Sequence, residues 1–247
     1  MTPLLSFVNV GKRYSDGGRE IHVLDDVSLD IDMGVSVGVL GARRSGKSTL
    51  LRLAAGITLA DSGTIYFRGR DIARMGGRER GRLLRGQIAF VSSADWRANL
   101  SESVLDHVAM SLGSEGLTIR EARRRASRVL EEVEIGAGDI EEPITSLVPA
   151  ERARVMLARA LAHEPCLLVA DEPALIPSPS ERDTFYALLR KAASERNMTL
   201  LMASEEMAAL QGTRILMSIA GGEVVSTEAR GTVVPMPRRA GAERPGQ

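Results

Sequence analysis

The sequence predicts an α/β protein built on a parallel sheet with crossover helices, preceded by an antiparallel β subdomain and interrupted by an inserted helical lobe. Three observations support this fold class. Strand and helix patterns alternate after residue 150, a short apolar strand near residue 40 runs into a glycine-bearing loop and a helix, and residues 100–140 show only helical periodicity. The chain has 247 residues and is 44% hydrophobic, which is enough for one globular unit with a sizeable core.

The first part of the chain has mainly strand patterns. Stretches 4–14 and 21–32 alternate apolar and polar residues around the turn-prone SDGGRE, which predicts an antiparallel pair. GVSVGVLG, residues 34–41, is typical of a short buried strand, and KSTLLRLAAG, residues 47–56, has helical spacing that ends at a glycine. Two further strands are expected at residues 62–69 and 87–93.

Helical patterns at residues 100–113 and 117–136 define the expected lobe, which extends over about residues 95–160. After these patterns, helices and strands alternate, as in parallel sheets with crossover helices, with expected elements at 150–165, 166–171, 180–197 and 199–204. The tail, residues 229–247, is rich in Pro, Gly and Arg and has little to bury. We therefore expect a domain over residues 1–228 and a disordered tail.

The composition limits the classes of partner. Lys plus Arg and Asp plus Glu both total 32, so the net charge is zero and we expect no binding to nucleic acid. The single cysteine, Cys166, excludes an internal disulfide. No stretch approaches the ~18 consecutive apolar residues of a membrane span. We expect a cytoplasmic chain.

The stretch GARRSGKSTL, residues 41–50, matches the phosphate-binding P-loop pattern GxxxxGK(S/T) between a strand and a helix. In this pattern backbone N–H groups surround the phosphates, Lys47 neutralises the β and γ oxygens, and the Ser48 hydroxyl ligates Mg²⁺. Arg44 can disturb the turn, add a second cation or simply face solvent. The pattern predicts an ATP and Mg²⁺ site formed by Gly41, Arg44, Ser45, Gly46, Lys47, Ser48 and Thr49.

A second motif, CLLVADEP, ends an apolar strand with two carboxylates. Such a pair is costly near a core unless it serves a cation or a hydrogen-bond network. We assign Asp171 to the magnesium shell and Glu172 to catalysis, as the base for an attacking water.

With these motifs in order, the chain resembles the ATP-binding subunits of ABC transporters up to about Val225, nearest the lipoprotein-release and macrolide-export branch, with the polysaccharide-export branch second. LARALAHEPCLLVADEP is similar to the segment that joins the family's signature helix to its Walker B strand. Tyr14 is similar to the aromatic residue that stacks on adenine, although it equally fits a half-buried strand. The resemblance implies a membrane-spanning permease, a second ATP-binding subunit, and a place at the inner face of the cell membrane.

The chain departs from the family pattern at four motifs. Ser93 stands where the family has the Q-loop glutamine, and LVPAE at 147–151 stands where it has the signature LSGGQ. Ser178 replaces the D-loop aspartate, and Ser204 replaces the switch histidine. Pro149 has no N–H, and Glu151 places negative charge near the γ-phosphate that the signature faces across a dimer. These changes remove groups that position the reaction and leave the phosphate and magnesium ligands in place.

The sequence therefore predicts an ABC-type ATP-binding subunit with weakened hydrolysis. One alternative is a fully active ATPase in which Glu205, Glu206 or Asp95 takes over the positioning role. Another is a non-enzymatic regulatory or scaffold subunit whose ATP binding only stabilises the fold or a contact.

Overall fold

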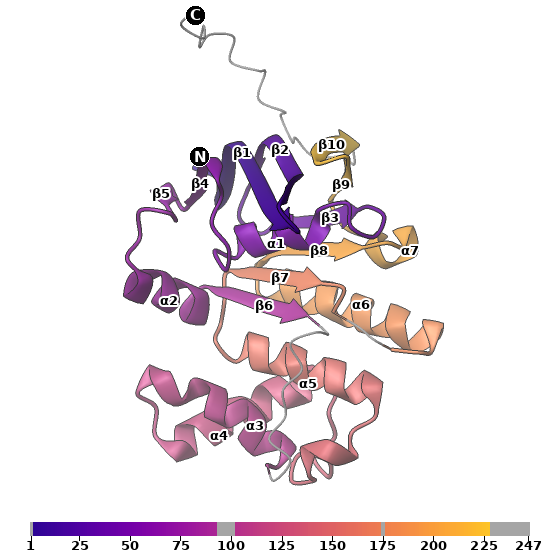
Figure 1. Ribbon diagram of the computed structural model, residues 1–247. Helices are drawn as coiled ribbons and strands as arrows, with labels where there is room; N and C mark the ends of the chain where they lie inside the picture. The colour runs from indigo at the N-terminus through magenta and orange to yellow at the C-terminus, as the bar shows by residue number, and fades with distance from the viewer. Residues whose placement is uncertain (1, 93–101, 174–175, 228–247) are drawn as a thin grey trace, which may run out of the picture.

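The computed structural model describes residues 2–92, 102–173 and 176–227 (Figure 1). It contains an antiparallel sheet, a mainly parallel sheet with helices on both faces, and a helical lobe below them in the view of Figure 1. The predicted fold class is confirmed. The tail 229–247, with residues 95–101 of the predicted lobe, lies outside the described residues.

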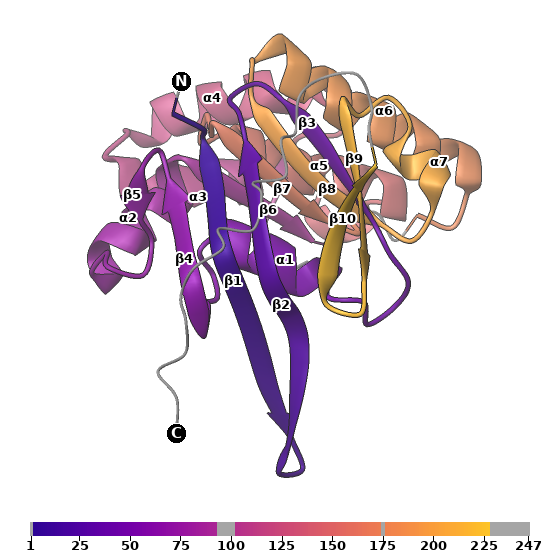
Figure 2. The same ribbon diagram turned by 90° about the horizontal axis from the view of Figure 1, so that it is seen from above.

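The antiparallel sheet has the strand order β2-β1-β4-β5. Its long hairpin turns at Gly17 and Gly18, which both have positive φ, and projects beyond the rest of the sheet in Figure 2. The hairpin agrees with the predicted pair of strands. The strands are β1 (Leu5–Asp16), β2 (Arg19–Ile31), β4 (Ser62–Phe67) and β5 (Arg70–Asp71).

The second sheet has the order β10-β9-β3-β8-β7-β6, parallel except for β10 at one edge. In register, Leu40 lies beside Ser204, and Asp171 lies beside Ala203. Because the carboxyl ends of parallel strands share one edge, the ends of β3, β7 and β8 meet there. The strands are β3 (Ser36–Leu40), β6 (Ile88–Ser92), β7 (Leu167–Asp171), β8 (Thr199–Ser204), β9 (Ile215–Ala220) and β10 (Glu223–Thr227).

Two hydrophobic cores lie on opposite faces of this sheet. Along β7, Leu167 and Val169 belong to the core shared with α1 and the antiparallel sheet, while Leu168 and Ala170 belong to the core shared with the lobe and α6. This alternation follows from the two-residue period of a strand, and it explains why the whole of β7 is apolar up to Asp171.

Helix α1 (Lys47–Ala54) lies between the two sheets and contacts β2, β7 and β8 (Figure 1). On the other face, α6 (Pro179–Glu195) packs against β8, α5 and the short α7 (Met207–Leu210). The lobe consists of α3 (Val104–Ser111), α4 (Ile119–Glu132) and α5 (Pro149–Leu161), with 3₁₀ turns at Leu112–Glu115 and Ile144–Ser146. A capping box between Thr118 and Glu121 begins α4.

Several elements were not predicted. Helix α2 (Gly77–Gly86) has the sequence GRERGRLLRG, in which three glycines and four arginines hide the apolar spacing. The pair β9 and β10, joined at Gly221 and Gly222, was also missed, although its strand pattern is readable. In the described part of the chain, no helix is long and apolar enough to cross a membrane.

Candidate nucleotide-binding site

The glycine loop joins the end of β3 to the start of α1. A Cβ added to Gly41 would lie 2.8 Å from the Ile219 Cγ2, and one added to Gly46 would lie 2.9 Å from the Val23 carbonyl oxygen. Gly46 also has a φ of 108°, which favours glycine. The backbone therefore passes too close to its neighbours for a side chain, and the N-terminus of α1 has no side-chain cap, so its N–H groups suit an anion.

Lys47 is the first residue of α1 and is buried, with only 4% of its side chain exposed. Its ammonium donates hydrogen bonds to the carbonyl oxygens of Gly41 and Ala42, at 2.8 and 2.9 Å. It also lies 3.6 Å from Glu172 Oε1 and 3.9 Å from Glu205 Oε1. The loop thus holds its cation at its own centre, between two carboxylates.

Ser48 and Asp171 come together across 123 positions of sequence. The Ser48 hydroxyl donates to Asp171 Oδ1 at 3.0 Å, from the first turn of α1 to the end of β7. The described residues hold no cluster of three or more His, Cys, Asp or Glu that could bind a metal alone. Mg²⁺ beside phosphates needs only one or two protein oxygens, and this pair supplies a hydroxyl and a carboxylate. The residues therefore fit the predicted ion.

Glu172 follows β7 directly and its side chain is 49% exposed. Its φ is 43°, in the left-handed region that costs a side-chain-bearing residue roughly 1 kcal/mol. Its N–H donates to the Ala203 carbonyl oxygen at 3.4 Å. The turn directs the chain away from the sheet and leaves the carboxylate beside Lys47, at the edge where β3, β7 and β8 end.

Within the loop, Arg43 and Arg44 are both exposed. Arg44 has a φ of 61°, so an arginine occupies a backbone conformation that favours glycine. Arg43 Nε lies 3.4 Å from Glu205 Oε1. The Ser45 hydroxyl is buried without a hydrogen-bond partner, which fits a loop built to meet an oxygen-rich ligand. Thr49, the next residue after Ser48, is half-buried in α1.

Tyr14 lies on β1, opposite Ile21, and is 39% exposed. Lys12 Nζ lies over its ring, 5.4 Å from the centroid. On the paired strand Val23 touches the loop, because its carbonyl oxygen limits the space at Gly46. The hairpin that carries Tyr14 therefore flanks the glycine loop, and the ring is partly exposed.

The residues at the altered motifs have local structural roles. Ser178 caps α6, where its hydroxyl accepts from the Glu181 N–H at 3.5 Å. Ser204 is buried and accepts from the Glu206 N–H at 3.0 Å. Ser93 lies outside the described residues, as does Asp95.

Sequence reasoning missed Tyr186, a buried residue of α6 that hydrogen-bonds to Ser204. Burial raises the pKa of its phenol, which therefore stays protonated at neutral pH. An isolated tyrosine inside a helical pattern carries no signal that could have revealed this contact with the end of β8.

The stretch at 147–151 forms the start of α5. Pro149 is the first helical residue, a position whose N–H has no partner within a helix, so the missing N–H of proline costs no hydrogen bond. The Val148 N–H donates to Glu151 Oε2 at 2.9 Å. The Glu151 carboxylate thus turns back onto the N-terminus of its own helix, where a negative charge is favourable. The chain itself supplies the anion at this helix end.

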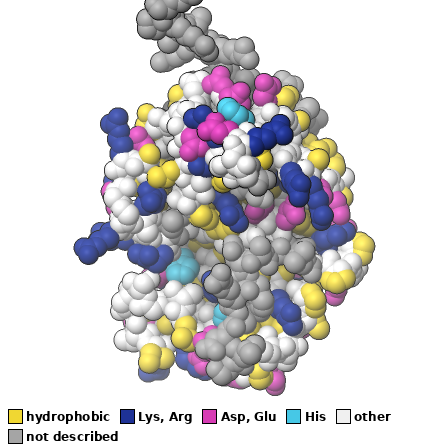
Figure 3. All heavy atoms as spheres, viewed as in Figure 1, with side chains coloured by type: hydrophobic (Ala, Val, Ile, Leu, Met, Phe, Trp, Pro, Cys, Tyr) yellow, Lys and Arg dark blue, Asp and Glu magenta, His cyan; other side chains and the backbone are white. Residues whose placement is uncertain are grey.

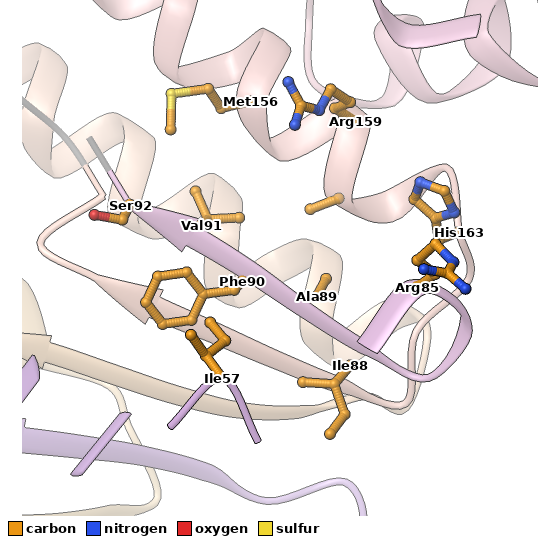
Figure 4. A pocket seen from close by; sticks show the side chains of 11 residues that line it. Ile57, Arg85, Ile88, Ala89, Phe90, Val91, Ser92, Met156, Arg159 and His163 are labelled. Atoms are coloured by element: carbon orange, nitrogen blue, oxygen red, sulfur yellow. The ribbon is translucent and has the colours of Figure 1, made fainter. Parts of the chain in front are cut away.

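A separate groove lies between β6 and α5 and has a volume of about 290 Å³ (Figure 4). Ile57, Phe90 and Met156 form apolar walls, and Arg85 and His163 both line one end. Arg159 projects from α5 and also contacts His107 Nε2 at 3.3 Å. The groove is therefore apolar with a basic end.

A glycine loop at a helix N-terminus, with a buried lysine and a Ser–Asp pair beside it, defines a P-loop nucleotide-binding protein. A family model described as "ABC transporter" matches residues 24–175. The chain belongs to the ABC transporter family, as an ATP-binding subunit, and the predicted family is confirmed.

Similar proteins agree with this assignment. The chain is 30% identical over 223 residues to the lipoprotein-releasing system ATP-binding protein LolD of Pseudomonas syringae pv. tomato. The matched region covers 90% of this chain and 97% of that protein. It is 34% identical over 217 residues to the LolD protein of Nitratidesulfovibrio vulgaris, over 87% of this chain and 92% of the relative. The dimeric ATP-binding cassette MJ0796 bound to ADP and Pi has the same fold, with a TM-score of 0.84, 24% identity, and coverage of 92% of this chain and 100% of that one.

Proposed function

We propose that this subunit couples Mg-ATP binding to a membrane-spanning permease, and that its own hydrolysis is weak. The observation that carries the proposal is a contrast between two helix N-termini. At α1 the N-terminus is open, with Lys47, Ser48 and Asp171 gathered beside it. At α5 the corresponding end is closed by Glu151 of the same helix. Binding groups are thus kept, while the surface that would face a second nucleotide is filled.

The residues divide by role. Lys47 and the backbone of Gly41 to Gly46 bind the phosphates, with Arg44, Ser45 and Thr49 beside them, and Tyr14 stacks on the adenine. Ser48 and Asp171 hold Mg²⁺, which would neutralise phosphate charge there. Glu172, whose Oε1 lies 3.6 Å from Lys47 Nζ, orients and deprotonates a water.

The relatives suggest how the subunit is placed in the cell. A lipoprotein-releasing system and a methionine importer both contain similar ATP-binding proteins. We place residues 1–228 as one ABC-type domain at the inner face of the cell membrane, joined to a permease and to a second ATP-binding subunit. Lys and Arg side chains are interspersed with Asp and Glu over the face in Figure 3, which supports a protein partner in place of nucleic acid.

The groove of Figure 4 is our proposed contact with the permease. Its apolar walls and the exposed Arg85 suit a short helix that carries an apolar side chain and a carboxylate, whereas His163 is already paired with Glu115 at 2.8 Å. Ile57, at the wall, is 48% exposed and so is available to a partner.

The overall proposal is tested with the co-purified membrane complex. Calorimetry measures Mg-ATP binding to the isolated subunit, and phosphate release measures turnover with and without the permease. We expect the isolated subunit to bind Mg-ATP, and we expect slow turnover in both preparations that changes when the permease is present. Binding without a permease-dependent effect and without a stable complex would favour the regulatory or scaffold alternative.

Replacing Glu172 by glutamine is expected to lower turnover less than about tenfold, because missing positioning groups already limit the rate. Glu195→Gln, near the end of α6, is the matched control. A wild-type turnover of order 1 s⁻¹ or above, with a drop of more than about a thousandfold in Glu172→Gln, would contradict weak hydrolysis.

Replacing Ile57 by glutamate is expected to reduce recovery of the permease with the subunit at least about tenfold, because a charge would be buried against an apolar partner. Met33→Glu, at a similarly exposed residue outside the groove, is the control. Nucleotide affinity should be the same in both variants. Equal recovery of the permease with both would remove the groove from the interface.

A further inference from the structure

Glu205 lies at the carboxyl end of β8, directly after Ser204. Its Oε1 is 3.9 Å from Lys47 Nζ and 3.4 Å from Arg43 Nε, so one carboxylate oxygen joins two cations of the glycine loop. The side chain is 36% exposed and Arg43 is 88% exposed, so this bridge lies at the open side of the loop. It is not needed to hold a core together.

Lys47 is the only buried cation at the loop among the described residues, and its ammonium is already engaged. Two carbonyl oxygens of the loop and the Glu172 carboxylate surround it, in addition to Glu205. In a P-loop this ammonium neutralises the β and γ oxygens of the nucleotide. A carboxylate that pairs with it therefore competes with those oxygens.

The competition differs between the two nucleotides. A diphosphate places its last charge at the β position, whereas a triphosphate adds a further phosphate at the end marked by Glu172, the proposed base. Glu205 approaches Lys47 from the end of β8, two residues after Ala203, which lies beside Asp171. With a diphosphate bound, its carboxylate competes for Lys47 with the β oxygens alone, whereas with a triphosphate it also meets the charge of the terminal phosphate and must move away.

We propose that Glu205 is a specificity-determining residue that biases this site toward nucleoside diphosphate over nucleoside triphosphate. The inference rests on the proposed nucleotide binding at the glycine loop. The physical reason is that the Glu205 carboxylate, held by Lys47 and Arg43, lies where the charge of the terminal phosphate must be neutralised.

The neighbouring residue offers a matched control. Glu206 has the same side chain and a similar position at the strand end, but its carboxylate pairs with Arg182 of α6, at 3.3 Å. Its hydrogen bond to the Ser204 hydroxyl is donated by the backbone N–H, which a glutamine keeps. Glu206→Gln therefore removes one carboxylate charge nearby without freeing Lys47.

The test is calorimetric titration of the full chain with Mg-ATP and with Mg-ADP, for wild type, Glu205→Gln and Glu206→Gln. We expect Glu205→Gln to tighten Mg-ATP binding about tenfold and to change Mg-ADP binding less than about threefold, while Glu206→Gln leaves the ratio of the two affinities unchanged. The ratio of the Mg-ATP affinity to the Mg-ADP affinity is compared, because a smaller fraction of folded protein affects both affinities equally.

Two outcomes would overturn the inference and are distinguishable. If both nucleotides bind all three proteins and Glu205→Gln has the wild-type ratio, or if Glu206→Gln shifts the ratio equally, then Glu205 does not set the preference and the proposed function stands. If neither nucleotide binds any of the three, both the inference and the proposed function fail.

Discussion

Replacing Lys47 by alanine is expected to weaken Mg-ATP binding at least about a hundredfold. The ammonium is the one buried cation described at the loop, and hydrogen bonds to charged groups contribute roughly 1.5–3 kcal/mol each. Two such bonds to phosphate oxygens cover the ~2.7 kcal/mol that a hundredfold change requires. The loss also leaves Glu172 and Glu205 facing the phosphates without a cation between them.

The measurement is calorimetry on wild type, Lys47→Ala and Lys191→Ala. Lys191 is an exposed lysine of α6 and provides the control for loss of one positive charge. The thermal stability of each variant is measured as well, because in Lys47→Ala the carbonyl oxygens of Gly41 and Ala42 also lose their hydrogen-bond donor. Equal affinity in a folded Lys47→Ala protein would remove the assignment of residues 41–48 as a nucleotide site.

The second large effect is expected when the start of α5 is rebuilt as Leu-Ser-Gly-Gly-Gln. The changes are Val148→Ser, Pro149→Gly, Ala150→Gly and Glu151→Gln, with Ser204→His added in a further variant. ATP-dependent dimerisation should appear and turnover should rise at least about tenfold, because N–H donors, a hydroxyl and an imidazole return to the terminal phosphate. The internal anion at the helix end is removed at the same time.

The rebuilt protein should lose some stability. The glutamine of Glu151→Gln can still accept from the residue 148 N–H, but it lacks the negative charge that is favourable at a helix N-terminus, and two glycines near the helix start cost roughly 1 kcal/mol each relative to alanine. Sedimentation and phosphate release are measured with ATP and with ADP, and Glu151→Gln alone separates the charge effect from the backbone effect. If no rebuilt protein dimerises or turns over better than wild type, the regulatory or scaffold reading replaces that of a transporter motor.

The loop and its magnesium pair could be predicted because both depend on local order. A strand, a glycine loop and a helix in sequence place Lys47 and Ser48 at a helix N-terminus, and an apolar strand that ends in Asp171 must reach the same sheet edge. The contact between Ser48 and Asp171 follows from these two facts alone. The roles of these residues in binding remain predictions.

The rest depends on contacts between elements far apart in the sequence. Tyr186 of α6 contacts Ser204, and Glu205 at the end of β8 contacts Arg43. No periodicity or spacing in the sequence predicts either contact. The capping contact of Glu151 is local in the sequence, but it can be predicted only once the helix is known to begin at Pro149. Helix α2 was hidden because its arginines and glycines suppress the apolar period.

The position of β3 in the middle of its sheet also determines when the site is completed during synthesis. Its neighbours β8 and β9 come from residues 199–220, so the glycine loop emerges from the ribosome long before β3 has either partner. At the usual pace of translation this delay is on the order of ten seconds. By then β2 and β7, which contact α1, have already been made, but β3 itself has no strand on either side. A nascent chain cut short before residue 199 would therefore carry the whole phosphate-binding motif on a strand without neighbours in the sheet.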